Sequence, residues 1–444
     1  MSAPGDDFPF LRQGGRGYDE ARTRAIWNKR LDRARAPDAI VCCSSTQQAA
    51  AAVRHARANG LKVSPRGSGH HYEAAALRQG GLLLDLGDLK RVDIDPEART
   101  AWIGAGVCGG ELSERLAEHG FAFPVGHCVD VGLSGYILAG GFGWNGGEWG
   151  AASANVEAIE AVTAEGEIVI ASEQDNADLF WAARGHGPGL FATVTAYRIR
   201  LHPLPPAVWA WRAMFPLASA PRLVDWINAA ALTADRSLEL GCFVLAAPDS
   251  QMPAIIVRVS ASGEDEDDAR ARTASFASPP TDVERLWAPK GEALTFTELP
   301  RLSPMPSGKR VAADHVWSEA PVGDLLLAVH HLLPPSPDST IDLVAYGGSA
   351  PVALPENAAL SITGRTGAGI YALWDDAADD DTNRAWVRRV DEALAPYRTG
   401  RYVGEADLTL APDRRAQCFA PGVLDRIAEV RQRYDPHGVF FAYP

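Results

Sequence analysis

Ser64-Pro65-Arg66-Gly67-Ser68-Gly69-His70-His71-Tyr72 is a glycine-rich segment at the end of a short predicted strand, residues 61–67. Glycines let backbone N–H groups converge on an anion without obstruction by side chains. Arg66 adds a positive charge where this loop begins. The segment therefore predicts a loop that can cradle a pyrophosphate, and a plain connection after a strand is the alternative.

A second segment, residues 126–143, is equally rich in glycine and otherwise apolar. It reads Gly126-His127-Cys128-Val129-Asp130-Val131-Gly132-Leu133-Ser134-Gly135-Tyr136-Ile137-Leu138-Ala139-Gly140-Gly141-Phe142-Gly143. This density of glycine indicates backbone that packs flat against a ligand, and a tight glycine-packed turn in the core is the alternative. Taken alone, Cys128 is more often a small buried apolar residue than a reactive thiol.

A third segment, Gly104-Ala105-Gly106-Val107-Cys108-Gly109, matches the G-x-G-x-x-G fingerprint of dinucleotide-binding folds. Asp130 follows about 20 residues later, as that fingerprint requires. The helix predicted next, residues 110–120, is short, however, and the segment lies between the two other glycine-rich loops. We therefore expect a fortuitous match, which makes a nicotinamide-dependent enzyme the less favoured hypothesis.

The first part of the chain alternates short apolar runs with helical patterns, as in mixed α and β structure. Residues 47–60 predict a helix after the capping candidates Ser44, Ser45 and Thr46. Strands are predicted at residues 80–87, 100–107 and 190–205, and a strand–turn–strand unit at residues 157–172. Prolines 203, 205 and 206 then mark a boundary. Beyond it, residues 254–263 and 339–348 predict antiparallel strands, and residues 382–394 and 421–440 predict helices.

The bulk composition limits the classes of function. The chain has 444 residues and a formal net charge of −14, which predicts two or three structural units and no nucleic-acid partner. It has no uninterrupted apolar run of about 18 residues, and residues 1–16 lack the pattern of a secretory signal. The six cysteines form no CxxC pair and no HExxH motif is present, so we expect no metal site. We expect a cytoplasmic protein with no membrane partner.

Taken together and in order, these segments resemble the berberine bridge enzyme-like oxidases of the vanillyl-alcohol oxidase superfamily. The loops of that family read Arg-Gly-Gly-Gly-His-Ser, Cys before Val-Gly-x-x-Gly, and Gly-Gly-Gly-Phe-Gly. They match residues 66–71, 128–135 and 139–143. Further motifs extend the resemblance over nearly the whole chain: Trp27-Asn28 before Pro37, Val162-Thr163-Ala164-Glu165-Gly166-Glu167, residues 178–185, and Tyr434-Asp435-Pro436 with Phe440.

The resemblance implies an α+β fold with two lobes. Residues 1–205 would form an FAD-binding domain of the PCMH type with two subdomains. Residues 206–399 would form a substrate-binding domain, an antiparallel sheet backed by helices. Residues 400–444 would return to the FAD-binding domain as the berberine bridge enzyme-like element, and the flavin ring would lie at the interface of the lobes.

The resemblance also implies FAD that is attached at two points. In the family, the histidine that matches His70 bonds the flavin 8α-methyl carbon, and the cysteine that matches Cys128, in members that have it, bonds flavin C6. A thiolate and a neutral imidazole are both competent nucleophiles. The remaining cofactor contacts that the resemblance implies are Arg66, Gly67, Ser68, Gly69, His71, Val131, Gly132, Ser134, Gly135, Gly140, Gly141, Gly143, Asn155, Val156 and Tyr402.

The implied activity is that of an oxidase for an alcohol, sugar or secondary-metabolite intermediate. A base would remove an O–H or N–H proton, hydride would pass to flavin N5, and dioxygen would reoxidise the flavin to give hydrogen peroxide. An amine oxidase, a dehydrogenase and a non-redox cyclase are alternatives within the same fold. The protein would be a monomer or a homodimer.

The segment that carries the base in many family members departs from the family pattern. The family reads Tyr-x-Asn-Tyr-x-Asp, and this chain reads Tyr402-Val403-Gly404-Glu405-Ala406-Asp407. Glu405, in place of the second tyrosine, is either a carboxylate base or a surface carboxylate. We expect Tyr402, Glu405 and Tyr346 to be catalytic. Tyr346 and Arg365 are candidates for substrate binding, and packing explains either residue equally well.

Overall fold

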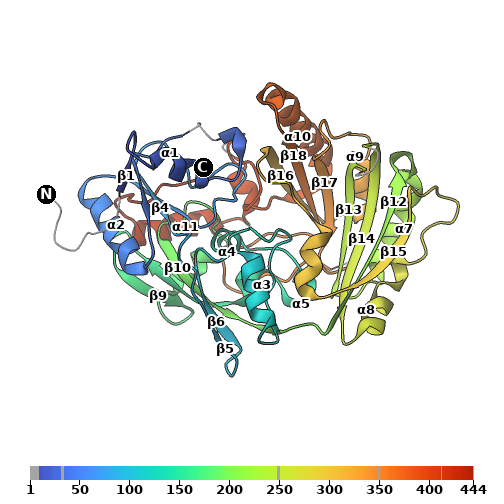
Figure 1. Cartoon of the computed structure of the whole chain (residues 1–444), viewed down its shortest axis with the longest axis horizontal. Coiled ribbons are helices and arrows are strands. Elements are labelled where there is room, and N and C mark those ends of the chain that lie inside the picture. Colours follow the sequence, from blue (N-terminus) through green and yellow to red (C-terminus); the bar gives the residue numbers. More distant parts are fainter. Residues whose placement is uncertain (1–9, 32–34, 248–250, 349, 412, 444) are drawn as a thin grey trace.

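The chain folds into two lobes that lie side by side in the computed structural model (Figure 1). The structure describes residues 10–31, 35–247, 251–348, 350–411 and 413–443. Residues 1–9, on which the expectation about a secretory signal partly rests, lie outside the described residues. Each lobe combines sheets with helices, so the predicted two-lobed α+β fold is confirmed.

The first lobe contains a four-stranded sheet in the order β1-β2-β4-β3. Its strands are β1 (Phe10–Arg12), β2 (Ala39–Cys42), β3 (Val63–Arg66) and β4 (Leu82–Asp85). β2 and β3 each pair in parallel with β4, and β1 lies antiparallel to β2. The helix α2 (Thr46–Ala58) covers this sheet with a row of buried alanines. It begins where predicted, because the Ser45 side chain accepts a hydrogen bond from the Gln48 N–H group.

A second, antiparallel sheet of the first lobe has the order β5-β6-β10-β8-β9. Its strands are β5 (Val92–Asp95), β6 (Thr100–Gly104), β8 (Val156–Val162), β9 (Ile168–Ser172) and β10 (Thr193–Arg200). The strand predicted over residues 190–205 is shorter than expected. After β10 the chain continues as β11 (His202–Pro203), which pairs with β7 (Phe121–Ala122) in a separate small sheet.

The second lobe is built on one eight-stranded sheet in the order β15-β12-β14-β13-β17-β18-β16-β19. Its strands are β12 (Ala207–Pro216), β13 (Leu238–Ala246), β14 (Pro253–Gly263), β15 (Trp287–Leu294), β16 (Arg310–Ser318), β17 (Thr340–Ala345), β18 (Thr366–Trp374) and β19 (Arg398–Gly400). The helices α7 (Ala220–Leu232), α9 (Val322–Val329) and α10 (Asp380–Leu394) bury one face of the sheet. The opposite face meets the first lobe, where Trp317 and Tyr346 join the core of that lobe.

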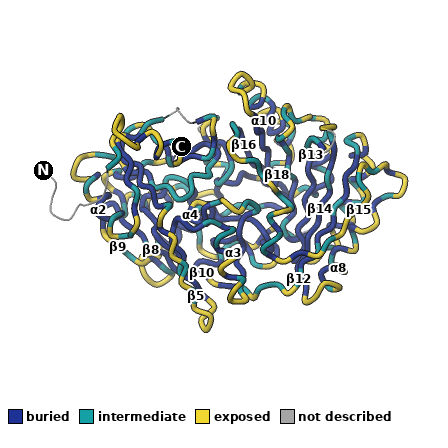
Figure 2. The backbone as a smooth tube through the Cα atoms, viewed as in Figure 1, coloured by how far each residue is buried: buried dark blue, intermediate teal, exposed yellow. Residues whose placement is uncertain are grey.

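The C-terminal part of the chain returns to the first lobe. The helix α11 (Val423–Tyr434) packs on α6 (Ala177–Ala183), and the Val63 N–H group donates to the carbonyl oxygen of Val439. Figure 2 shows that most strands of the three larger sheets are buried along most of their length, whereas β5 and β15 at sheet edges are more exposed. Among the residues described, none of the helices is long and apolar enough to span a bilayer.

Candidate active site

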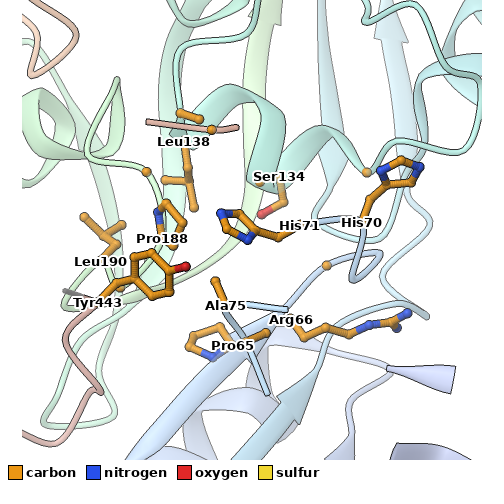
Figure 3. A pocket seen from close by; sticks show the side chains of 18 of the residues that line it. Pro65, Arg66, His70, His71, Ala75, Ser134, Leu138, Pro188, Leu190 and Tyr443 are labelled. Carbon is orange, nitrogen blue, oxygen red and sulfur yellow. The ribbon is translucent and has the colours of Figure 1, made fainter. Parts of the chain in front are cut away.

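A large cavity lies between the first two glycine-rich segments and is closed by the C-terminal part of the chain. Together with the open solvent at its mouth, the space between the protein atoms measures about 1270 Å³. Twelve of the predicted site residues line it: Arg66, Gly67, Ser68, Gly69, His70, His71, Val131, Gly132, Ser134, Gly135, Tyr402 and Glu405. Figure 3 shows several of the side chains that surround this space.

Glycines let the two segments approach each other and leave room beside them. The Gly132 N–H group donates to the Ser68 hydroxyl at 2.9 Å, and a Cβ atom on Gly132 would lie 2.6 Å from that oxygen. Gly135 differs, because a Cβ atom there would meet no atom within 4 Å although the residue lines the cavity. Gly132 therefore serves the close contact of the loops, and Gly135 keeps the cavity open.

Arg66 shapes the first loop instead of pointing a free charge into the cavity. Its Nη1 atom lies 2.7 Å from Oδ1 of Asp85, and its Nη2 atom donates to the Ser68 carbonyl oxygen at 2.6 Å. Since a carboxylate balances the guanidinium, the loop is rigid and locally neutral. Its remaining capacity to bind an anion lies in the glycine backbone.

His71 and Tyr443 present polar atoms to the cavity that have no partner among the described residues. His71 Nε2 and Tyr443 Oη are both buried, and their rings meet edge to face at 5.6 Å (Figure 3). Burial, with the charge of Arg35, lowers the pKa of His71 to about 4, so the imidazole is neutral at physiological pH. Buried polar groups nearly always have partners. These two atoms therefore fit a polar ligand such as a dinucleotide cofactor.

His70 lines the cavity, whereas Cys128 does not appear among the residues that line it. The His70 ring stacks on Trp27 at 4.5 Å, and its Nε2 atom lies 3.3 Å from Oδ1 of Asp130. Cys128 is partly buried, and burial together with nearby carboxylates, Asp130 and Glu405 among them, raises the pKa of its thiol to about 12. Without a partner group the thiol is therefore protonated at physiological pH.

Glu405 forms part of the cavity wall and is not a surface carboxylate. The Tyr371 hydroxyl donates to its Oε2 atom at 2.6 Å. Burial raises the pKa of Glu405 to about 7, against the opposing effects of Tyr371, His127 and His70. Its neighbour Tyr402 is held in place, since its hydroxyl oxygen accepts a hydrogen bond from the Gly141 N–H group at 3.3 Å. A carboxylate that titrates near neutral pH can accept a proton from a substrate.

Polar side chains also gather on the face of the second-lobe sheet that meets the first lobe, outside the lining of the cavity. Tyr346 stacks on His127 with ring centres 6.1 Å apart, and His127 Nε2 lies 3.0 Å from both carboxylate oxygens of Glu239. On β17, burial raises the pKa of Asp342 to about 6. The sequence analysis identified Tyr346 but missed His127, Glu239 and Asp342, because their role depends on how the two lobes meet.

Comparisons with known proteins agree with this geometry. Residues 37–172 match the sequence profile of an FAD-binding domain. An FAD-linked oxidoreductase of Hypoxylon pulicicidum is 25% identical over 94% of this chain and 93% of its own length. The fold matches 6-hydroxy-D-nicotine oxidase of Arthrobacter nicotinovorans with a TM-score of 0.84 and 25% identity, over 99% of this chain and 98% of that one. The chain has the fold of the berberine bridge enzyme-like proteins and contains an FAD-binding domain. A berberine bridge enzyme-like protein of Physcomitrella patens also matches, with a TM-score of 0.85 and 21% identity, over 98% of this chain and 96% of that one.

Some residues predicted for the site have internal partners instead. Gly140 and Gly141 take φ angles of +117° and +80° and pack against Leu360 and Tyr136, and Gly143 packs against the Val125 carbonyl oxygen. These glycines do not appear among the residues that line the described cavity. They fit the turn that was the alternative for this segment, and contact with the cofactor stays a prediction for them.

Asn155, Val156 and Arg365 also lie outside the lining of the cavity. The Asn155 amide donates to two carbonyl oxygens of its own loop, and Val156 is buried in β8. Arg365 lies on the helix-covered side of the second lobe, in a separate small cavity beside Asn228 of α7 and Val322 of α9. This position does not support Arg365 as a substrate ligand, and packing is the better explanation.

The G-x-G-x-x-G match of residues 104–109 has a packing explanation. A Cβ atom on Gly104 would lie 2.2 Å from the Leu89 carbonyl oxygen, and one on Gly106 would lie 2.3 Å from that of Gly87. These glycines therefore allow β6 to approach the loop before β5. This agrees with the expectation that the match is fortuitous.

Proposed function

We propose that the protein is an oxidase that carries FAD attached covalently through His70 and Cys128, with Glu405 as the proton acceptor. The observation that carries the proposal is that Glu405, hydrogen-bonded by Tyr371, lies in the wall of a cavity that His70 also lines. A base with a pKa near the working pH and a cofactor anchor are thereby present in one site. We propose an alcohol, sugar or secondary-metabolite intermediate as the substrate.

Glycines, unpartnered polar atoms and His70 line the cavity and fit the cofactor, while Cys128 lies outside the lining. The backbone of Gly67, Gly69 and Gly132 would hold the phosphates, and His71 and Tyr443 would supply polar partners at the inner end. His70 and Cys128 would hold the ring end covalently. Because a covalent cofactor cannot leave, the site can stay open to a bulky substrate.

When bound, the flavin would accept a hydride from the substrate and pass the electrons to dioxygen, which gives hydrogen peroxide. The protein itself would orient the substrate and remove its proton. Glu405 would accept the O–H or N–H proton at Oε1 or Oε2, and the Tyr371 hydroxyl would stabilise the carboxylate before the transfer. Tyr346 and Tyr402 would shape the pocket around the reacting carbon.

Other expectations also remain proposals: the division of the chain at residues 205/206 and 399/400, a cytoplasmic location, and a monomer or homodimer. The second of these divisions would cut β19, which pairs with β16 in the second-lobe sheet. Within the same fold, an amine oxidase, a dehydrogenase or a cyclase is the alternative.

The proposal is tested by screening alcohols, sugars and amines for peroxide formation under air. We expect one mole of peroxide for each mole of substrate oxidised, and Glu405→Gln should lower the turnover rate by about 10²–10⁴-fold. Glu114→Gln, an exposed change on α3 (Gly109–Ala117), is the matched control and should keep wild-type turnover. Turnover without peroxide would favour the dehydrogenase, and full turnover by Glu405→Gln would refute the assignment of the base.

A further inference from the structure

Two adjacent residues, Trp27 and Asn28, hold the loop that carries His70. The Trp27 N–H group donates to the carbonyl oxygen of Gly69 at 3.1 Å. The side-chain amide of Asn28 donates to the carbonyl oxygen of Tyr72 at 2.6 Å. One of these carbonyl groups comes directly before His70 in the chain, and the other comes two residues after it. The backbone is therefore fixed on both sides of the histidine.

The ring of Trp27 also supports the side chain of His70. The two rings stack with their centres 4.5 Å apart and an angle of 21° between their planes. Asp130, on the second glycine-rich segment, places Oδ1 at 3.3 Å from Nε2 of His70. The ring of Tyr72 lies edge on, with its centre 6.5 Å from that of the imidazole. Contacts on these sides limit rotation of the imidazole where it lines the cavity.

The carboxamide of Asn28 uses every hydrogen-bonding position that it has. Its Nδ2 atom donates to the carbonyl oxygens of Tyr72, at 2.6 Å, and of Val311, at 2.9 Å. Its Oδ1 atom accepts from the N–H groups of Val311, at 2.9 Å, and of Arg30, at 3.0 Å. An amide nitrogen has two protons to donate and an amide oxygen has two lone pairs, so no position is left free. The side chain is 0% exposed, and these bonds fix residues 27–28 in place.

This arrangement joins the loop of His70 to the second lobe, because Val311 belongs to β16. Arg30 adds a second link between the lobes. Its Nε atom donates to the carbonyl oxygen of Val311 at 2.8 Å, and its Nη2 atom donates to Oε1 of Glu73 at 2.6 Å. Glu73 follows the loop of His70 in the first lobe and is buried. The support of His70 is therefore complete only when the two lobes are docked.

We propose that Trp27, held in place by Asn28, is a positioning residue for the covalent attachment of the cofactor to His70. This inference rests on the proposed attachment of FAD at that histidine. Neither Trp27 nor Asn28 is among the residues that line the described cavity. Trp27 therefore acts through the imidazole, by keeping its ring in one orientation, and makes no contact of its own with the cofactor.

Attachment depends on the orientation of the imidazole because a new bond has to form. A bond between an imidazole nitrogen and the 8α carbon of the flavin replaces one C–H bond of the methyl group. The methyl group and the imidazole each release one proton. The electron pair of the broken C–H bond stays on the ring until dioxygen takes it up and, with two protons, gives hydrogen peroxide. A displacement of a reacting group by about 1 Å can slow such a step by roughly 10²-fold.

The test is the rate at which added FAD becomes covalently bound to the full-length protein, purified without flavin from riboflavin-starved cells. The flavin that remains in the acid-precipitated pellet measures attachment, and a Cys128→Ala background leaves His70 as the only proposed point of attachment. In that background, Trp27→Leu should attach FAD at least about tenfold more slowly, because no flat ring supports the imidazole. Trp27→Phe should keep most of the rate. The total FAD bound after gel filtration should be equal in all variants, which separates slow attachment from weak binding.

The matched control is Trp149→Leu. Trp149 stacks on His202 with the ring centres 4.6 Å apart, and neither residue lines the cavity. This substitution removes a similar pair of rings and should leave the rate of attachment unchanged. If Trp27→Leu does not fold, Trp27→Met replaces it, because a flexible thioether side chain fills the space without a flat face.

An unchanged rate in Trp27→Leu would overturn the positioning role of Trp27, and so would an equal loss of rate in Trp149→Leu. Equal losses in Trp27→Phe and Trp27→Leu would also overturn it, because the flat ring would then not matter. If Cys128→Ala alone leaves no flavin in the pellet, attachment through His70 is refuted, and with it the part of the proposed function on which this inference rests.

Discussion

The hydroxyl of Tyr371 donates a hydrogen bond to Oε2 of Glu405, with 2.6 Å between the two oxygens. Tyr371 belongs to β18 in the second lobe, whereas Glu405 follows β19 on the segment that returns to the first lobe. The pair therefore forms only when the two lobes are assembled. It also links the substrate side of the site to the cavity in which the cofactor is expected.

Removal of this hydrogen bond should shift the pH dependence of the site. In Tyr371→Phe, the ionised form of Glu405 loses a donor, so the pKa of the carboxyl should rise by about one unit from its value of about 7. The acidic limb of the pH–rate profile, where activity grows as Glu405 ionises, should move upward by the same amount. An unchanged limb, measured as flavin reduction without oxygen, would show that another group titrates there.

Glu405 should also lower the stability of the protein at alkaline pH. Its pKa in the folded protein lies above the ordinary glutamate value, so the folded state binds this proton more tightly than the unfolded state. The stability that results is fully present below the unfolded pKa and is lost as pH rises toward 7. The free energy of unfolding of Glu405→Gln should therefore be roughly 3 kcal/mol higher than that of the wild type at pH 8, and only slightly different at pH 4. Denaturant unfolding at the two pH values measures this difference, and an equal effect at both would contradict the raised pKa.

A buried ring of four charges should be needed for folding. Arg401 and Arg414 each contact both Asp314 of β16 and Asp391 of α10, and all four side chains are at most 11% exposed. Removing one member leaves an uncompensated buried charge, so Asp314→Asn should cost about 3–5 kcal/mol in the free energy of unfolding.

The exposed pair of Arg222 and Asp282 provides the control for this prediction. Arg222→Gln should cost less than about 1 kcal/mol, because water screens an exposed ion pair. Equal losses in Asp314→Asn and Arg222→Gln, measured by urea unfolding at one pH, would show that the buried ring adds nothing beyond a surface contact.

Substitutions at Gly135 should change cofactor binding without changing folding. A side chain there meets no atom within 4 Å and would project into the cavity. Gly135→Leu should therefore fold normally but purify with at least about tenfold less flavin, whereas Gly135→Ala should retain it, since one methyl group fills little of the space. Flavin content per polypeptide, with circular dichroism as the test of folding, measures the effect. Normal flavin content in the leucine variant would place the cofactor elsewhere.

Local sequence patterns predicted much of the fold. The helix α2, the buried strand β4 and the strand–turn–strand unit β8–β9 appear as expected, because capping residues, glycines and apolar runs act over short distances. The two glycine-rich loops of the site were found for the same reason. The neutralisation of Arg66 by Asp85 was not predicted, since it depends on the pairing of β3 with β4.

The partners of the site residues could not be predicted from the sequence. Tyr371 meets Glu405 across 34 positions, and His127 meets Glu239 across 112. Tyr443 has no motif around it that marks a ligand contact, and only its buried hydroxyl, which has no partner in the described part of the chain, draws attention to it. Such contacts are set by how the lobes and the C-terminal part pack together, which hydrophobic periodicity does not encode.

The most direct test of the central claim is an absorption spectrum of the purified protein before and after precipitation with acid. We predict a flavin spectrum in the native protein and a yellow pellet, because His70 and Cys128 hold the cofactor covalently. His70→Ala with Cys128→Ala should give a white pellet and a yellow supernatant. A white pellet from the wild-type protein would contradict covalent attachment, and a colourless protein that takes up no FAD would contradict the account as a whole.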